Sequence, residues 1–301
     1  MKKMLLSLAV LVSSSAFAQV LNVNSIEMVN LPIDGERIVA GISPKGDYIL
    51  LTGSQLDGLT KYDLATGKSE VLTTAWGAGN GVKITADGKN VVYREDSFVN
   101  GLRYTDVVKK DLATKAEVSL TKATRNLNTI ALQGGNAMIV NSGRLTKKVV
   151  TKSLNTTGTA PVVSIDNKQL MITKNGVTSV LSPNGTQYSY IWPSVSPDGK
   201  KVCYFVCGVG CFVSDINGKN VKELGILRAA QWYDNNTVVG MKDADDGHMI
   251  TASAIIAKTL DGKSQTLTDA SMIAMYPYAS SASKKIVFST INGEAYIINV
   301  K

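Results

Sequence analysis

A turn motif that recurs along this chain constrains its fold more than any other feature. Three segments, at residues 42–51, 84–93 and 195–204, align without a gap. Each has an apolar stretch, a turn rich in Pro, Asp or Gly, and then a strand of β-branched and aromatic residues. Such turn residues adopt the backbone angles of a tight reversal, so each copy predicts a β-hairpin.

Four weaker copies bring the motif to seven occurrences. The first residues after the seven turns are Tyr48, Asn90, Asn136, Gln169, Lys201, Thr237 and Lys285. They lie roughly 32 to 48 residues apart, and a repeat period near 40 is typical of β-propellers. The sequence therefore predicts an all-β propeller of seven blades, with six blades as the alternative because residues 127–187 follow the pattern poorly.

Further strands follow the hairpins. Residues 61–68 and 212–219 predict third strands that end in a turn, and residues 70–73, 117–121 and 265–268 predict fourth strands. No stretch has convincing helical periodicity. We therefore expect four strands in each blade, as in other propellers.

The two ends of the chain predict how the ring closes. The last repeat stops after its third strand, at residues 294–300, whereas residues 20–31 precede the first repeat and carry apolar side chains in alternation. Pairing these two segments would remove exposed sheet edges. We expect the N-terminal strand to pair with the last blade.

The most specific copy of the motif begins at Trp192 and reads Trp-Pro-Ser-Val-Ser-Pro-Asp-Gly-Lys-Lys, followed by an aromatic strand. Here the chain resembles the WD-like repeat propellers of TolB and the propeller domains attached to prolyl-oligopeptidase and dipeptidyl-peptidase relatives. The resemblance covers nearly all of the chain after residue 18 and implies a propeller, which in TolB-type proteins usually has six blades. Because propellers serve ligand binding, protein docking and catalysis alike, the resemblance implies no functional residues.

Residues 1–18 have the features of a signal peptide. Two lysines precede an apolar run at residues 4–12, and Ala16-Phe17-Ala18 offers small side chains at the two cleavage subsites. The run is shorter than the roughly 20 residues of a membrane-spanning helix. The sequence therefore predicts cleavage before Gln19, a periplasmic or secreted protein, and a single propeller domain over residues 19–301.

The charge of the chain narrows the class of partner. Its formal net charge is +8, and loss of the two lysines of the leader leaves +6. The lysines look isolated and scattered along the sequence, which is typical of solubility and not of a nucleic-acid-binding stripe. We expect a monomer without a membrane span that binds a protein, peptide or glycan of the cell envelope and no nucleic acid.

Residues suited to catalysis are few. His248 is the only histidine, so the sequence cannot supply a polyhistidine metal site, and it has no Gly-x-Ser-x-Gly nucleophile elbow. A binding or docking scaffold without catalytic residues or a cofactor is the leading hypothesis. The alternative is a small-molecule or metal-dependent enzyme that uses one face of the propeller.

A cluster of carboxylates precedes the histidine. Asp243, Asp245 and Asp246 are closely spaced before a glycine, and carboxylate oxygens are the ligands that calcium prefers. The segment is not an EF-hand, because the twelfth position holds Ala254 where that loop needs a glutamate. A solvated acidic loop and a calcium site are both compatible with the sequence.

Three cysteines fall within one predicted hairpin. Cys203 and Cys207 lie on one strand, and Cys211 begins the next strand after a glycine-containing turn. An oxidising compartment would permit a disulfide between Cys207 and Cys211, although geometry decides. Three buried thiols and an incomplete zinc site are the alternatives.

Aromatic residues recur where the chain enters the inner strand of a blade. Counting nine residues back from Lys201, Thr237 and Lys285 reaches Trp192, Arg228 and Tyr276, which predicts equivalent positions in three consecutive blades. Aromatic and arginine side chains dominate binding hot spots. A ligand site is therefore predicted at these three residues with the adjacent Tyr190 and Tyr278, although packing of the aromatic rings between blades is the alternative.

Overall fold

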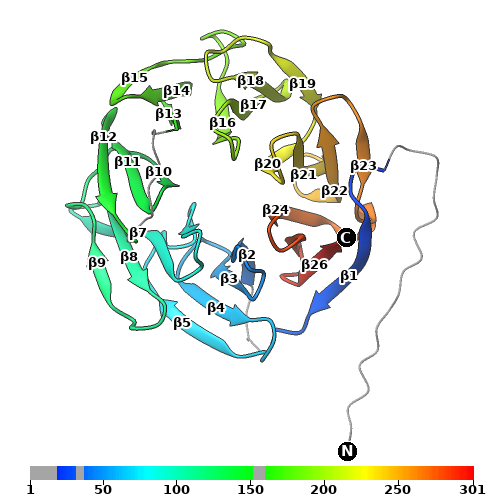
Figure 1. Ribbon diagram of the computed structural model, residues 1–301, viewed down its shortest axis with the longest axis horizontal. Coiled ribbons are helices and arrows are strands. Elements are labelled where there is room, and N and C mark those ends of the chain that lie inside the picture. Colours follow the sequence, from blue (N-terminus) through cyan, green and yellow to red (C-terminus); the bar gives the residue numbers. More distant parts are fainter. Residues whose placement is uncertain (1–18, 32–36, 152–159) are drawn as a thin grey trace, which may run out of the picture.

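The computed structural model describes residues 19–31, 37–151 and 160–301, and within them seven β-sheets are arranged in a ring around a central axis (Figure 1). The predicted all-β propeller with seven blades is confirmed. The predicted signal peptide lies outside the described residues. The described residues contain one short 3-10 helix, η1 (Ala270–Met272), and no helix long and apolar enough to span a membrane.

We number the blades in chain order, beginning with the sheet that contains β2, and count strands within a blade from the axis outwards. Their strands are as follows: blade 1, β2 (Arg37–Ile42), β3 (Tyr48–Gly53), β4 (Leu59–Asp63) and β5 (Ser69–Thr73); blade 2, β6 (Lys83–Ile84), β7 (Asn90–Val99), β8 (Leu102–Asp111) and β9 (Glu117–Ser119); blade 3, β10 (Leu127–Gln133), β11 (Asn136–Asn141) and β12 (Arg144–Val149); blade 4, β13 (Val162–Asp166), β14 (Gln169–Lys174) and β15 (Val177–Val180); blade 5, β16 (Tyr190–Val195), β17 (Lys201–Val206), β18 (Gly210–Asp215) and β19 (Lys222–Gly225); blade 6, β20 (Arg228–Trp232), β21 (Thr237–Asp245), β22 (Ile250–Thr259) and β23 (Ser264–Thr266); blade 7, β24 (Ala274–Ser280), β25 (Lys285–Thr290), β26 (Ala295–Val300) and β1 (Val23–Val29).

The recurring turn builds the first hairpin of a blade. In blade 5 the Ser196 hydroxyl donates to Asp198 Oδ1 (2.6 Å) and accepts from the Lys201 amide (3.0 Å), while Gly199 takes a φ of 72°. Blade 2 repeats this arrangement with Thr85 in the place of the serine. All seven residues predicted to follow a turn are the first residues of the second strands, which confirms the repeat.

Blades 3 and 4 depart from the predicted four strands. The described residues give each of these two sheets three strands, whereas the other five sheets have four. The described residues therefore show the four predicted strands in five of the seven blades, and residues 127–180, where the repeat is least regular, contribute three strands to each of blades 3 and 4.

Blade 4 is inverted relative to the other blades. In those blades the turn between the first and second strands lies on one face of the ring, which we call the lower face, and the turn between the second and third strands lies on the opposite, upper face. The inner strand of blade 4 begins instead at the lower face. Consistent with this, the Pro161 carbonyl accepts a hydrogen bond from Gln133 Nε2 (3.3 Å) at the lower end of blade 3. At the other end of β13, the Lys168 carbonyl accepts from the amide of Tyr190, the first residue of blade 5 (2.8 Å). The second blade of three strands restores the direction for blades 5 to 7.

The predicted closure of the ring is confirmed. Strand β1 pairs antiparallel with β26 through six residue pairs, from Val23↔Val300 to Val29↔Ala295. In Figure 1, β1 lies on the rim beside the C-terminus. The outer strand of blade 7 thus comes from the opposite end of the chain.

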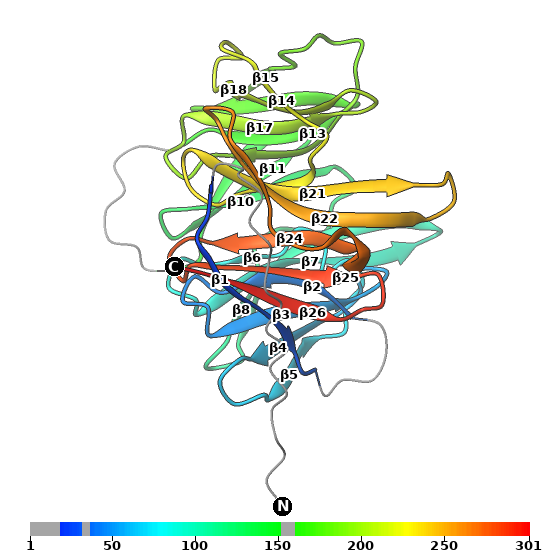
Figure 2. The same cartoon turned by 90° about the vertical axis from the view of Figure 1, so that its right-hand side faces the viewer.

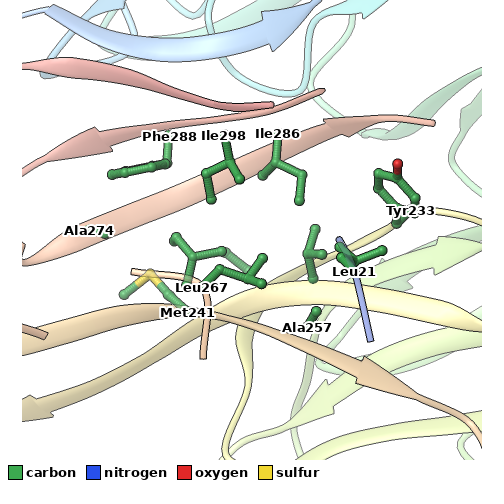
Figure 3. Packing of buried hydrophobic residues seen from close by; sticks show 12 residues of the cluster. Leu21, Tyr233, Met241, Ala257, Leu267, Ala274, Ile286, Phe288 and Ile298 are labelled. Atoms are coloured by element: carbon green, nitrogen blue, oxygen red, sulfur yellow. The ribbon is translucent and has the colours of Figure 1, made fainter. Parts of the chain in front are cut away.

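The core consists of apolar layers between neighbouring blades. Between blades 6 and 7, Leu21, Met241, Ile286, Phe288 and Ile298 pack together with less than 8% of each side chain exposed (Figure 3). Such layers require large side chains on both faces of a blade, which explains the runs of apolar residues in the second strands.

Candidate binding face

One face of the ring carries most of the exposed large apolar side chains. This upper face bears the turns between second and third strands of every blade except the inverted blade 4, together with the segments that lead into the inner strands. Its exposed apolar residues are Trp76, Phe98, Val99, Leu102, Tyr188, Trp192, Val209, Ile226, Met249, Tyr276 and Ile291. Exposed apolar residues gathered on one face indicate an interaction site.

Two aromatic residues of the upper face occupy equivalent positions in different blades. Trp192 and Tyr276 each lie in a bulge of the inner strand, have left-handed backbone angles (φ 52° and 51°), and are each 40% exposed. A left-handed conformation costs a bulky residue about 1–3 kcal/mol, and such strain is concentrated at functional sites. The Trp192 ring packs edge-on against Phe205, with 5.7 Å between centroids. The sequence correctly placed both residues at one register position.

Arg228 was predicted to occupy the position in blade 6 that is equivalent to Trp192 and Tyr276, but it lies one residue before that position. The bulge residue of blade 6 is Ala229 (φ 48°), because the pair Trp232↔Val238 encloses one residue fewer than the corresponding pair in blade 5, Val195↔Val202. The residue of blade 6 that is equivalent to Trp192 therefore lies eight residues before Thr237, not nine. Arg228 still lies on the upper face, where its Nη1 contacts Asp243 Oδ2 at 2.8 Å.

Tyr190 and Tyr278 are not part of an exposed site, and their assignment to it is corrected. Tyr190 is fully buried, and its hydroxyl donates to the Gly185 carbonyl (2.9 Å). Tyr278 packs against the apolar layer between blades 7 and 1, and burial raises its pKa to about 12. Both tyrosines pack in apolar layers between blades. Their closeness in sequence to Trp192 and Tyr276 therefore did not predict that they would be exposed beside them.

The three candidate calcium ligands are not gathered into a metal site. The Asp243 side chain is inaccessible to solvent and pairs with Arg228. Asp246 is exposed, and its Oδ1 accepts from the amides of His248 and Met249 (2.9 Å each). The described residues contain no group of three or more His, Cys, Asp or Glu side chains placed to hold an ion. The acidic segment is a hairpin turn, which corrects the calcium hypothesis.

The cysteine pairing predicted from sequence is also corrected. The sulfur next to Cys211 belongs to Cys203, with 3.6 Å between the two Sγ atoms, and both residues are buried. Cys207 lies beyond the last pair of the hairpin, Val206↔Gly210, and is exposed. The contact with Cys211 and burial raise the pKa of the Cys203 thiol, which favours its protonated form.

We expect one rapidly reacting thiol in the native protein. Cys207 is exposed, whereas the other two thiols are closed off by the core. Titration with a thiol reagent should count one thiol before unfolding and three after unfolding without a reductant, and Cys207→Ser should remove the rapid phase. A single thiol after unfolding would mean that Cys203 and Cys211 are bonded to each other.

The remaining candidates for catalysis do not form a recognisable active site. His248 is exposed in the turn between β21 and β22, a hairpin that projects beyond the other strands (Figure 2). Two shallow hollows lie away from this histidine, one against the β11–β12 hairpin and one against β19, β22 and β23. A second long hairpin, β7–β8, has ten-residue strands and carries Phe98 near its turn. The sequence shows its turn region, residues 95–101, as an insertion equivalent to the one that holds His248.

Comparison with known proteins places the fold among propellers. No protein-family model matches the chain, and no curated protein matches it. Among solved structures, the chain is similar to the putative TolB from Agrobacterium tumefaciens, with 15% identity and a TM-score of 0.55 over 91% of this chain and 96% of that one. It is similar to TolB from Acinetobacter baumannii, with 17% identity and a TM-score of 0.52 over 80% of this chain and 56% of that one. An oligogalacturonate lyase in complex with manganese is similar at 13% identity and a TM-score of 0.50, over 86% and 76%. The chain therefore has a TolB-like propeller fold.

Proposed function

We propose that the protein is exported and acts as a binding scaffold, whose upper face holds a protein, peptide or glycan of the cell envelope around Trp192 and Tyr276. The exposed aromatic pair carries this proposal. Each ring is fixed by a strained bulge at the entrance of an inner strand and stays 40% exposed. Rigid aromatic side chains supply large contact area at low entropic cost, as expected of binding hot spots.

Export is supported by the sequence of residues 1–18, which has the charged, apolar and small-residue regions of a cleavable leader. The similarity to TolB structures is consistent with a scaffold, although it extends only to the fold. An enzyme that uses the upper face is the alternative. It would require an acid, base or metal site there, and the exposed His248 is the one histidine available.

The double variant Trp192→Ala/Tyr276→Ala tests the proposal. Bait protein would be purified from the envelope fraction, and its intact mass should place the first residue at Gln19. Capture of a stoichiometric envelope partner should fall at least tenfold, because two hot-spot truncations of about 2 kcal/mol each remove most of the binding energy. The stability of the bait should change little, since both side chains are 40% exposed.

The matched control is Val71→Ala/Val118→Ala, which removes exposed apolar side chains from the outer strands β5 and β9. This control should capture the partner as the unmodified protein does. Equal capture by all three baits would contradict the proposal. Turnover of an envelope polymer without any captured partner would favour the enzyme.

A further inference from the structure

Among the described residues, strand β12 is the outermost strand of blade 3 and forms its open edge. It pairs with β11 from Asn141↔Arg144 to Asn136↔Val149, and it pairs with no other strand of the described residues. Five of its six residues are exposed, and Val149 is 70% exposed. Such an edge presents unpaired amides and carbonyls with which another chain can pair.

Blade 7 shows that an outer strand can come from a distant segment. There β1, which precedes the first blade in sequence, pairs with β26 as the fourth strand. The geometry of this propeller thus accepts an added antiparallel strand at the rim. An outer strand therefore need not be contiguous in sequence with the blade that it completes.

Basic residues predominate in the part of the sequence that contains the open edge. Residues 121–189, which contain blades 3 and 4, hold eight Lys or Arg residues and one acidic residue, Asp166, and so carry a net charge of +7. The whole chain after residue 18 carries +6, so the rest of it sums to −1. The basic residues are therefore distributed unevenly along the chain, and the expectation of scattered lysines is wrong for residues 121–189.

Strand β12 itself is basic. Arg144, Lys147 and Lys148 are exposed, and none of them belongs to an ion pair within the described part of the chain. At the upper end of β12, Arg144 and Thr146 line a shallow hollow with Asn141 and Ser142. Guanidinium, amide and hydroxyl groups are donors suited to a carboxylate.

We propose that β12 binds an acidic, extended peptide segment of a partner protein, which pairs with it as the fourth strand of blade 3. Backbone hydrogen bonds would supply affinity, and carboxylates opposite Arg144, Lys147 and Lys148 would supply specificity. An anionic polymer without peptide amides could use the charges but not the strand edge. The site is separate from the upper-face aromatics, and the inference does not rest on the proposed function.

The register of β12 shows which amides face the partner. The two-residue turn at Ser142-Gly143 makes Asn141 and Arg144 a hydrogen-bonded pair, and bonded pairs then alternate along the strand. The amides of Leu145, Lys147 and Val149 therefore point to the open edge. Proline at position 147 would remove an outward donor without breaking a bond to β11.

A labelled nine-residue peptide of alternating Glu and Val is the probe, and its binding to the mature protein is measured by fluorescence anisotropy. Two peptides serve as comparisons, one with Lys in place of Glu and one with N-methyl groups on alternate amides of the acidic peptide. We expect the acidic peptide to bind at least tenfold more tightly than either. Dextran sulfate, a polyanion without amides, should compete only weakly.

Two variants of β12 separate charge from strand pairing. Lys147→Glu/Lys148→Glu should weaken binding at least tenfold, and Lys147→Pro should weaken it at least fivefold relative to Lys147→Ala, which keeps the amide. Lys68→Glu/Lys219→Glu is the matched control, because both lysines are exposed and belong to blades with four strands. It should bind as the unmodified protein does, as should Trp192→Ala/Tyr276→Ala.

Three results would overturn the inference. Equal binding of the N-methylated peptide, or equal binding by Lys147→Pro and Lys147→Ala, would show that charge alone attracts the probe. Strong protection of the Lys147 amide from hydrogen exchange in the free protein would show that the edge is already covered.

Discussion

A truncated chain that begins at residue 31 should fail to form a stable ring. The lost segment contacts three blades. Gln265 Oε1 in blade 6 accepts hydrogen bonds from the amides of Val20 and Leu21 (2.7 and 2.8 Å), and in blade 1 the Tyr62 hydroxyl donates to the Asn30 carbonyl (2.8 Å). Between these contacts β1 completes blade 7, so its removal opens the ring at the junction of its two ends.

The expected loss is comparable with the stability of a whole domain. Burial of apolar side chains from this segment contributes about 1.5–3 kcal/mol for each fully buried residue, and Leu21 is 7% exposed in the layer shown in Figure 3. Together with the strand pairing, the loss should reach about 5–10 kcal/mol, which lies within the roughly 5–15 kcal/mol that is the usual total stability of a protein. Thermal unfolding followed by circular dichroism measures it.

A synthetic peptide of residues 19–30 added in trans is the critical control. It should restore cooperative unfolding to the truncated chain. Among point variants, Leu21→Ala should cost about 2–3 kcal/mol, whereas Met28→Ala should be nearly neutral because Met28 is 58% exposed. Unchanged cooperative unfolding of the truncated chain would show that β1 does not close the ring.

Arg228→Ala should destabilise the protein by about 2–4 kcal/mol, a smaller loss than for a fully buried pair because the arginine is partly exposed. The variant leaves the Asp243 carboxylate, whose side chain is inaccessible to solvent, without its cation. Asp243 Oδ1 has no hydrogen-bond partner in the structure, so the charge depends on the contact through Oδ2. Arg228 is therefore unsuitable as a pure test of ligand binding, although the sequence alone suggested it for that purpose.

A double-mutant cycle isolates this ion pair. Asp243→Asn removes the buried charge, so a further Arg228→Ala should cost little in that background. The melting temperature of Arg228→Ala alone should fall by roughly 4–16 °C, given a loss of about 2–4 kcal/mol and about 2–4 °C per kcal/mol for a large domain. Equal effects of Arg228→Ala in both backgrounds would show that the two residues are not coupled.

The repeat carried most of the fold information in this sequence. Residues such as Asn90 and Lys201 could be placed at strand starts because the turns before them need glycine at a positive φ and a Ser or Thr hydroxyl to satisfy the backbone. The three strands that the described residues give to each of blades 3 and 4 were not predictable in this way. A turn motif fixes the first hairpin of a blade and says nothing of how many strands follow.

The candidate site was predictable only in part. Trp192 and Tyr276 were located because both precede turns of equal length. Arg228 was misplaced by one position because the turn of blade 6 is one residue shorter, and a single residue changes the face on which a strand residue lies. The pairing of Cys203 with Cys211 depends on diagonal neighbours across β17 and β18, which requires the register and not only the spacing.

The most direct test of the proposed scaffold is a hydrogen-exchange map of the protein alone and in complex with the partner that it captures from the envelope. We expect slower exchange on binding in the upper-face segments around Trp192 and Tyr276, including the β7–β8 and β21–β22 hairpins that project on that face. The turns of the lower face, at residues 43–48 and 196–201, should exchange at unchanged rates. Protection confined to the lower turns, with no change around Trp192 and Tyr276, would contradict the proposal.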